Sequence, residues 1–473
     1  MVELKATADE AATLAKFMET AASQAQAGGQ FAKSLTTGND VVTPGTTGGA
    51  ALRPQDLAAD IKNLTFGKND FVMFNLVPRG RATSTAYEYN IKDGYGDTGS
   101  SRFVQEMEIA DINDISYERK VVRMKIISDT RQMSILSAQV ANVVNPMDEL
   151  LDASMTVVAK TIEYGIFYGD ADMSQIGEGQ GNEFDGLKKL IPDSNVIDLR
   201  GTVLTELNLN SAAVRIAENY GHATSAFMPV GVQAAFVQNQ LNRQWVAQGG
   251  AENLASGFNV PKFYSAQGAI NLYPSTIMDY EKRLNTNAVI KPTAPAAPNV
   301  TATVADAAGR FSDADIASPL KYAVVVESAG SAKSAPTLVT AALNKVTNAV
   351  TLDVDLGAQI IGTPRDIAVY RFDVNSGAYY RIGRVPMYKA TNVAGSWHVT
   401  FVDENDEIAG TSDVFIGELD GGILQLVELN SMQRLPLATV KAALQFTILW
   451  QGALALYAPK KWALLKNVKA QVM

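Results

Sequence analysis

One segment, residues 145–170, constrains the fold most strongly because its pattern specifies a single long helix. Its sequence is NPMDELLDASMTVVAKTIEYGIFYGD. Asn145 is a favourable N-cap, and Pro146 suits the first helical position, where no N–H donor is needed. A helix that ends at Tyr168 would be roughly 35 Å long. That length predicts a spine that supports elements on both of its sides.

The apolar residues of this helix recur at helical spacing and predict one buried stripe. The stripe consists of Met147, Leu150, Leu151, Met155, Val158, Ile162 and Ile166. The polar side is predicted to face solvent or neighbours, and it carries Asp148, Asp152, Lys160 and Glu163. Gly165 or Gly169 can end the helix. An ordinary core helix is the alternative interpretation.

Composition excludes several classes of function. The net charge of −9 argues against nucleic-acid binding through bulk charge. The chain has no cysteine, which excludes thiol catalysis, disulfides, iron–sulfur clusters and cysteine zinc sites. Its two histidines, His222 and His398, lie far apart in the sequence, which argues against a catalytic triad or a histidine metal site. We therefore predict no catalytic residue, no cofactor and no metal, so the chain is not expected to be an enzyme.

Length and hydropathy predict a globular protein of about three domains. The chain has 473 residues, of which 47% are hydrophobic and 19% charged. The first 27 residues carry acidic side chains and have no continuous apolar core, so no signal peptide is expected. The longest apolar stretch, residues 444–457, is too short and too polar to span a bilayer. These features predict a soluble protein that is made in the cytoplasm and has no membrane partner.

The region before the spine helix is predicted to reach outward. In order, we expect an amphipathic helix at 1–27, a glycine-rich arm at 34–50, a short helix at 55–67, strands at 71–92, a loop tip at 93–101 and strands at 102–136. The two strand regions form a long two-stranded hairpin with few large apolar side chains near its end. Such a hairpin cannot bury itself, so we expect it to dock on a partner.

The region after the spine helix is predicted to be α+β with an all-β insertion. Helices at 211–220 and 231–241 alternate with strands at 226–230 and 258–278. Three prolines in residues 291–298 indicate an extended spacer. The following residues, up to about 417, contain six or seven short strands, which is typical of a β-sandwich. Because α+β character returns at residue 418, the sandwich is predicted to be an insertion.

Two polar motifs resemble ligand sites but are predicted to be structural. The glycine-rich loop at 177–181 is surrounded by acidic residues and has no following Lys of the P-loop kind, so a flexible loop is expected. Asp403, Asn405 and Glu407 do not have EF-hand spacing, and a solvated turn is expected.

Charged residues on the predicted hairpin are the candidate contact residues. We expect them to meet complementary surfaces on neighbouring copies. They are Arg79, Arg81, Lys92, Arg102, Glu106, Glu108, Arg119 and Arg123. A solvated charged surface is the alternative.

The order of these parts resembles a known family. A loose arm, a long hairpin, a spine helix ending in IEYGIFYGD, the segment FDGLKKLI and the closing run FTILWQGALALYAPKKWALLKNV follow one another. This arrangement resembles the major capsid protein of tailed bacteriophages, which has the Hong Kong 97-type shell fold. The resemblance covers about 28–290 and 418–473. The all-β insert departs from the minimal family pattern and resembles immunoglobulin-like or fibronectin-type domains found on the outer face of some capsids.

The resemblance implies a division of the chain into family parts. These are an N-terminal arm (1–60), the E-loop hairpin with the start of the peripheral domain (61–145), the spine helix and peripheral domain (146–194), the axial domain (195–290), the immunoglobulin-like insert (291–417), the second part of the axial domain (418–455) and the C-terminal peripheral strands (456–473). Some relatives cross-link a hairpin Lys to an Asn with the help of a Glu. Lys92 and Asn467 occupy comparable places, but no matching Glu can be placed, so cross-linking is not expected.

The implied function is self-assembly, as hexamers and pentamers, into an icosahedral shell that encloses double-stranded DNA. The implied partners are other copies of the chain, with scaffold, portal and decoration proteins, and weak non-specific contact with DNA. The implied location is the virion capsid, assembled in the host cytoplasm. Two alternatives stay open: a nanocompartment shell of the same fold, and a surface adhesin or glycan-binding protein built on the β-sandwich.

Overall fold

The computed structural model describes one compact unit within Asn63–Met473. The described residues are Lys16, which is helical, and 70–92, 103–107, 109, 114–139, 145–174, 181–240, 260–279, 282–285, 290, 294–328, 332–358, 364–438 and 442–470. The expected helix at 55–67, the arm at 34–50 and the loop tip at 93–101 lie outside them, as does all of the expected helix at 1–27 except Lys16. The predicted α+β class is confirmed, since helices and mixed sheets alternate along the chain.

The spine helix is α4, Pro146–Tyr168, with the predicted start and end. The Asn145 side chain accepts a hydrogen bond from the Met147 amide at 3.1 Å, and Gly169 follows the last helical residue. The predicted stripe is correct at Val158, Ile162 and Ile166, which are buried, whereas Leu150 and Leu151 are only partly buried. Two predictions were wrong. Met155 is 40% exposed, and Glu163, placed on the polar side, is completely buried.

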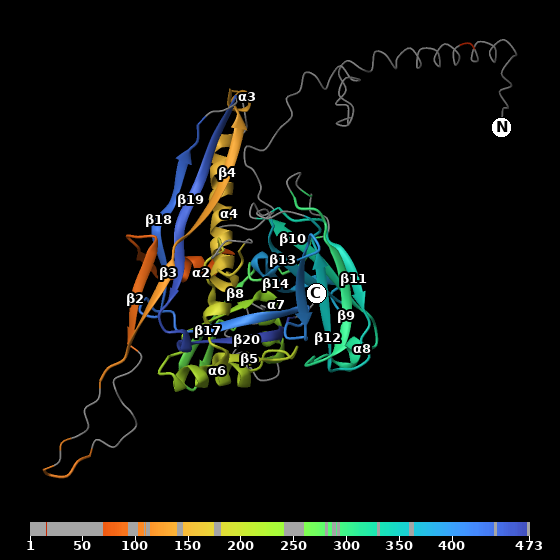
Figure 1. Ribbon diagram of the computed structural model, residues 1–473. Helices are drawn as coiled ribbons and strands as arrows, with labels where there is room; N and C mark the ends of the chain where they lie inside the picture. The colour runs from red at the N-terminus through yellow and green to blue at the C-terminus, as the bar shows by residue number, and fades with distance from the viewer. Residues whose placement is uncertain are drawn as a thin grey trace, which may run out of the picture. The chain divides into compact units, whose positions relative to one another are not determined.

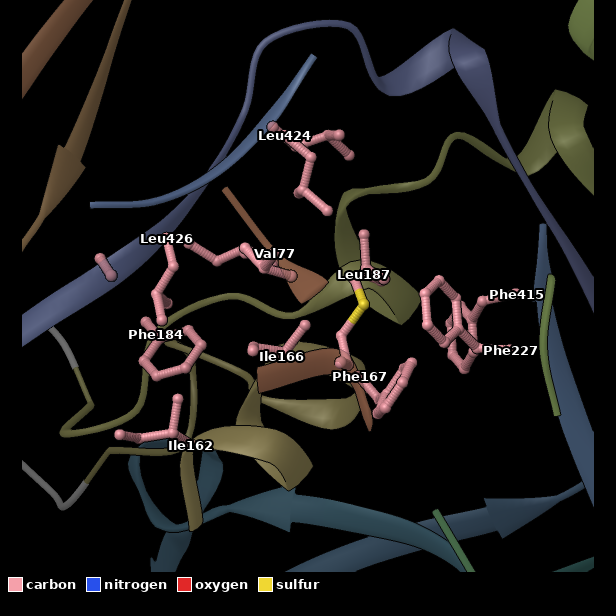
Figure 2. Packing of buried hydrophobic residues seen from close by; sticks show 14 of the residues in the cluster. Val77, Ile162, Ile166, Phe167, Phe184, Leu187, Phe227, Phe415, Leu424 and Leu426 are labelled. Atoms are coloured by element: carbon pink, nitrogen blue, oxygen red, sulfur yellow. The ribbon is translucent and has the colours of Figure 1, made fainter. Parts of the chain in front are cut away.

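A four-stranded sheet packs against α4, which runs alongside β4 and β19 in Figure 1. Its order is β1-β18-β19-β4, with β1 at Arg79–Arg81, β18 at Leu424–Pro436, β19 at Ala443–Leu456 and β4 at Lys125–Ser134. Alternate residues of β19, Phe446, Ile448 and Trp450, join Ile162 and Ile166 in one core. Figure 2 shows part of this core, where Ile162 and Ile166 lie near Phe184 and Leu426.

A six-stranded sheet, β5-β20-β17-β6-β8-β7, forms the second layer. Its strands are β5 (Val196–Asp198), β20 (Trp462–Lys469), β17 (Thr411–Gly417), β6 (Ser225–Pro229), β8 (Gly268–Ser275) and β7 (Lys262–Ser265). Helices α6 (Glu206–Glu218) and α7 (Val230–Gln240) contact it, and their buried residues share one core with it. The short elements α5 (Leu187–Leu190), η3 (Asp193–Asn195) and η5 (Pro459–Lys461) connect the layers.

The C-terminal strands do not pair with the segments that the implied family division groups them with. Residues 418–455 were grouped with the segment 195–290, but β18 and β19 pair with β1 and β4. Residues 456–473 were grouped with the spine helix, but β20 pairs with β17 and β5. The reason is the core that each strand faces: β19 presents bulky aromatic residues to α4, whereas Ala463 and Leu465 of β20 pack with α6.

Two four-stranded sheets form a β-sandwich around one apolar core. The first has the order β11-β10-β13-β14: Thr337–Ala341, Leu320–Ser328, Pro364–Asp373 and Ala378–Pro386. The second has the order β15-β16-β12-β9: Thr391–Val393, Ser396–Asp403, Asn348–Asp355 and Asn299–Asp306. Short helices α8 (Asp313–Ile316) and η4 (Met387–Lys389) accompany them. The predicted boundary at residue 417 was wrong, because β17 lies in the centre of the six-stranded sheet, with Gly417 packed directly on the Trp462 ring.

The hairpin consists of β2 (Ala86–Lys92) and β3 (Tyr117–Arg123), paired antiparallel as predicted. Strands were predicted throughout 71–92, but residues Val72–Leu76 form helix α2. The cause is a long-range cap. Glu163 of α4 accepts hydrogen bonds from the Met73 and Phe74 amides, at 3.0 and 2.5 Å, at the start of α2. The predicted strand at 102–136 likewise ends at Ser134, where α3 (Ile135–Gln139) begins.

Candidate assembly surfaces

One face of the hairpin is anchored to its own subunit. Tyr87 and Tyr89 contact Tyr457, which follows β19, and the Tyr87 and Tyr457 hydroxyls lie 3.1 Å apart. Tyr89 donates a hydrogen bond to the Leu456 carbonyl at 3.3 Å. Tyr457 in turn donates to Gln425 at 2.9 Å. The base of the hairpin therefore has a fixed direction relative to the four-stranded sheet.

The opposite face of the hairpin is exposed along its length and carries most of its charge. Cross-strand pairs on this face are Ala86–Arg123, Glu88–Val121, Asn90–Arg119 and Lys92–Tyr117. Three cations and one anion thus lie on the same open surface. Arg119 donates to Asn90 at 3.3 Å and lies 3.5 Å from Glu88, so the face is partly ordered by its own contacts. A cationic face on a chain of net charge −9 suits an acidic partner.

The other predicted contact residues have different surroundings. Arg79 pairs with Glu428 at 2.6 Å and stacks on the Phe74 ring, so it holds α2 and β18 together. Arg81 and Glu106 are exposed. Arg102 and Glu108 lie outside the described residues.

Sequence reasoning missed the apolar residues that follow the hairpin tip. Phe103 is 96% exposed, Met107 98% and Ile109 91%, all within a segment that has no strand in its described residues. Three large apolar side chains so open to water are a common mark of a protein interface. The sequence run FVQEMEI could have indicated this surface, because no apolar residues lie opposite its apolar residues in the predicted hairpin.

The N-terminal half of α4 presents an acidic surface. Asp148, Glu149 and Asp152 are exposed on it, with Met155 and Val157 also exposed nearby. Acidic residues here also interact favourably with the helix dipole. This surface combines negative charge with apolar side chains, as the hairpin face combines positive charge with Val121 and Tyr117.

Glu163 lies in the middle of the subunit rather than on its surface. Burial raises the pKa of this carboxyl group to about 7, although the amides of Met73, Phe74 and Val72 oppose the shift. Ala159, one turn earlier in α4, packs with Phe71 and Ile277 in a small buried cluster. The Glu163 carboxyl group acts as a structural clamp between α4 and α2.

Ion pairs around two buried carboxylates join different parts of the subunit. Arg384 of β14 contacts Glu183 with two nitrogens, at 2.8 and 3.0 Å, and Asp366 of β13 at 2.6 Å. Lys188 and Lys282 both contact Asp413 of β17, at 3.2 and 3.1 Å. Burial alone would lower the pKa of Lys188, but the Asp413 and Glu407 carboxylates raise it. Arg384 thus fixes β14 of the sandwich to the segment after α4, whereas the Asp413 cluster joins Lys188 of α5 and Lys282 to the six-stranded sheet.

The residues singled out as ligand candidates have structural roles. Asp403 accepts hydrogen bonds from Arg371 at 2.7 Å and Tyr322 at 2.8 Å, inside the sandwich. The described residues contain no cluster of three acidic or histidine side chains suited to a metal ion. His398 lies 3.1 Å from Asp353 on the open face of the sandwich, and the His222 amide donates to Glu418.

Asn467 is buried and has no free amide group for cross-linking. It donates to Asp198 and to the Asp406 carbonyl, both at 2.8 Å, and accepts from the Ile408 amide at 2.9 Å. These contacts give the residue a structural role near the end of β20. Lys92 is exposed on the hairpin. No described helix is both long and apolar enough to cross a bilayer.

Comparison with known proteins identifies the family. A family model described as SU10 major capsid protein matches residues 23–304. The chain is also 43% identical over 441 residues to a putative major capsid protein of Enterococcus phage phiEF24C, covering 92% of this chain and 94% of that protein. The chain belongs to the SU10 major capsid protein family. This capsid protein is likewise 41% identical over 440 residues to the major capsid protein of Staphylococcus phage K, with 92% and 94% coverage.

Family membership establishes the basic function: the chain is a phage major capsid protein, and its place is the virion capsid. Among solved structures, the capsid of a native GTA particle is similar with 7% identity, 92% and 100% coverage and a TM-score of 0.48. The SrpI encapsulin of Synechococcus elongatus is similar with 8% identity, 89% and 94% coverage and a TM-score of 0.45.

Proposed function

We propose that this capsid protein self-assembles, as hexamers and pentamers, into an icosahedral shell of the Hong Kong 97 type that encloses double-stranded DNA. The observation that supports the proposal is the exposed cationic face of the hairpin, which is available for contact with another copy. Arms and hairpins that reach neighbouring copies become ordered on assembly and stabilise a closed shell through many repeated contacts.

In this proposal the hairpin is the E-loop, and its partner is the acidic surface of α4 on the adjacent copy. Lys92, Arg119 and Arg123 would face Glu149 and Asp152 across the contact, with the apolar side chains of both surfaces between them. Each charge pair alone stabilises the contact only modestly, since exposed pairs contribute about 0.2–1 kcal/mol. A shell repeats the contact in every subunit.

The remaining parts have proposed places in the shell. The β-sandwich is an immunoglobulin-like or fibronectin-type domain displayed on the outer surface. The spine helix and the four-stranded sheet form the peripheral domain, and the six-stranded sheet forms the axial domain around the five-fold and six-fold centres. Scaffold, portal and decoration proteins are the proposed partners, contact with DNA is weak, and assembly takes place in the host cytoplasm.

Reversal of charge on the hairpin tests the proposed contact. The double variant Arg119→Glu/Arg123→Glu is expected to lower the yield of assembled shells at least tenfold, because it places like charges together at every contact. Adding Glu149→Lys/Asp152→Lys is expected to restore assembly. Negative-stain electron microscopy and sedimentation measure the assembled fraction.

The matched control is Lys345→Glu, which reverses one exposed cation on the β-sandwich. It is expected to leave shell yield unchanged. If the hairpin variant assembles like the wild type, the α4 contact is wrong. If the wild-type chain forms only stable monomers under all assembly conditions, the shell proposal itself is wrong.

A further inference from the structure

Strand β4 has a long open edge. It is the last strand of its sheet, and no other strand among the described residues pairs with its outer side. Its ten residues pair with β19 without a break in register. Of the strands at the edges of the described sheets, β4 is the longest. An edge of this kind exposes a row of backbone donors and acceptors that are ready to pair with another strand.

Two of the usual protections of an edge strand, proline and a β-bulge, are absent within β4. Its sequence, KIISDTRQMS, contains no proline or glycine, and its pairing has no bulge. Its two central charges neutralise each other, with Arg131 and Asp129 2.7 Å apart. The Lys125 ammonium at its start donates to the Gly181 carbonyl. Because its inward-facing charges and its Lys are already engaged, the edge can accept a further strand.

The side chains of β4 alternate between two environments. Ile127, Asp129, Arg131 and Met133 face the core side, where Met133 is buried and the other three are partly buried. Ile126, Ser128, Thr130, Gln132 and Ser134 are exposed on the other side. Residues directly opposite each other in an antiparallel pair lie on the same face, so a partner strand must match this alternation.

We propose that β4 pairs with β4 of a second copy, antiparallel and with Thr130 of both copies on a two-fold axis. In this register Asp129 lies opposite the partner subunit's Arg131, and Arg131 lies opposite the partner subunit's Asp129. Ile127 lies opposite the partner subunit's Met133, and Ser128 opposite the partner subunit's Gln132. The strand is thus complementary to itself in charge and in apolarity.

Neighbouring registers lose this complementarity. Centring the pair on Asp129 or on Arg131 places like charges opposite each other, which is destabilising. Centring it on Ser128 or Gln132 places a charged residue opposite Ile127 or Met133. Registers centred between two residues put the core face of one sheet on the solvent side of the other. Only the register centred on Thr130 satisfies charge, apolarity and face together.

This pairing rests on the proposed shell, and it adds a second kind of contact to it. The contact between hairpin and α4 joins two different surfaces and closes a ring, whereas the β4 contact joins identical surfaces across a two-fold axis. A ring contact combined with a two-fold contact links capsomers into a closed lattice. The two contacts share no residue, so mutation can disrupt either contact without changing the residues of the other.

Cysteine scanning tests the register, because the chain contains no cysteine of its own. Opposite residues in an antiparallel pair have Cα atoms about 4.5–5.5 Å apart, within the range of about 4.4–6.8 Å that a disulfide needs. Thr130→Cys alone is therefore expected to form a disulfide-linked dimer in oxidised shells. On non-reducing gels most chains should migrate at twice the mass of 50.6 kDa.

Three further variants act as controls for position. Ser128→Cys alone and Gln132→Cys alone are expected to stay monomeric, because four residues along the strand separate each from its copy by roughly 13 Å. The double variant Ser128→Cys/Gln132→Cys is expected to cross-link, since the two positions lie opposite each other. All three positions are exposed, and electron microscopy verifies that shells have formed before oxidation.

The outcomes separate the two proposals. Shells that form normally but leave Thr130→Cys monomeric overturn the β4 pairing and leave the shell proposal intact. Equal cross-linking at Ser128 alone and at Thr130 overturns the register. If no shells form from the wild-type chain, the shell proposal fails and the pairing with it.

Discussion

Replacing Arg384 by alanine is expected to destabilise the subunit by about 3–5 kcal/mol. Arg384 joins Asp366, whose side chain is fully buried, to Glu183 in the segment after α4. Removal of the guanidinium would leave the Asp366 carboxylate buried without its cation, and it would detach β14 from the loop at Glu183. The large cost comes from the buried Asp366 charge that loses its cation rather than from the lost attraction.

Urea unfolding of the purified, unassembled subunit measures this effect, with hydrogen exchange of β13 and β14 as the local readout. The matched control is Arg310→Ala, on the same domain, whose ion pair with Asp406 is long and exposed at 3.8 Å. This control is expected to cost less than about 1 kcal/mol. Equal destabilisation by the two variants would show that the buried bridge has no special role.

The second large effect is a dependence of stability on pH that arises from Glu163. Burial raises its folded-state pKa to about 7, above the ordinary value of 4.5 for a glutamate. Between these values the folded subunit keeps a proton that the unfolded chain has released. Stability from this group therefore falls as pH rises from about 4.5 to about 7, by up to ~3 kcal/mol, and then levels off.

Glu163→Gln is expected to remove this component, because an amide does not titrate. The quantity to compare is the free energy of unfolding at pH 5 and pH 7.5, measured for the wild type and the variant. The wild type should lose up to ~3 kcal/mol more than the variant over this interval. Glu149→Gln, on the exposed face of the same helix, is the control and should follow the wild type. If the free energy of unfolding of Glu163→Gln depends on pH as that of the wild type does, the role assigned to Glu163 is wrong.

The parts of this fold that sequence predicts well are those fixed by local chemistry. The bounds of α4 follow from Asn145, Pro146 and Gly169, all within a turn of the helix ends. The strands of the β-sandwich follow from alternating residues and nearby turns. The pairing of β2 with β3 follows from two similar runs on either side of a glycine-rich loop.

The parts that sequence does not predict depend on distant partners. Residues Val72–Leu76 have a strand-like composition, and only the Glu163 carboxylate, ninety residues away, caps them as a helix. Glu163 itself falls on the polar side of a helical pattern, and its burial depends on α2 covering it. Similarly, β17 resembles the sandwich strands before it, but its neighbours are β6 and β20. Periodicity identifies a strand and does not specify the sheet to which it belongs.

The position of β17 also sets an order of events during synthesis. It pairs with β6, and roughly 180 residues separate the two strands in the chain. At about 5–20 residues per second, the ribosome needs on the order of 10–40 s to supply β17 after β6. The β-sandwich is complete before β17 emerges, and its strands pair over shorter separations, which favours rapid folding. The inserted domain is therefore expected to fold first. Until β17 emerges, the six-stranded sheet is incomplete, and the edge of β6 that pairs with β17 is exposed to chaperones or to other nascent chains.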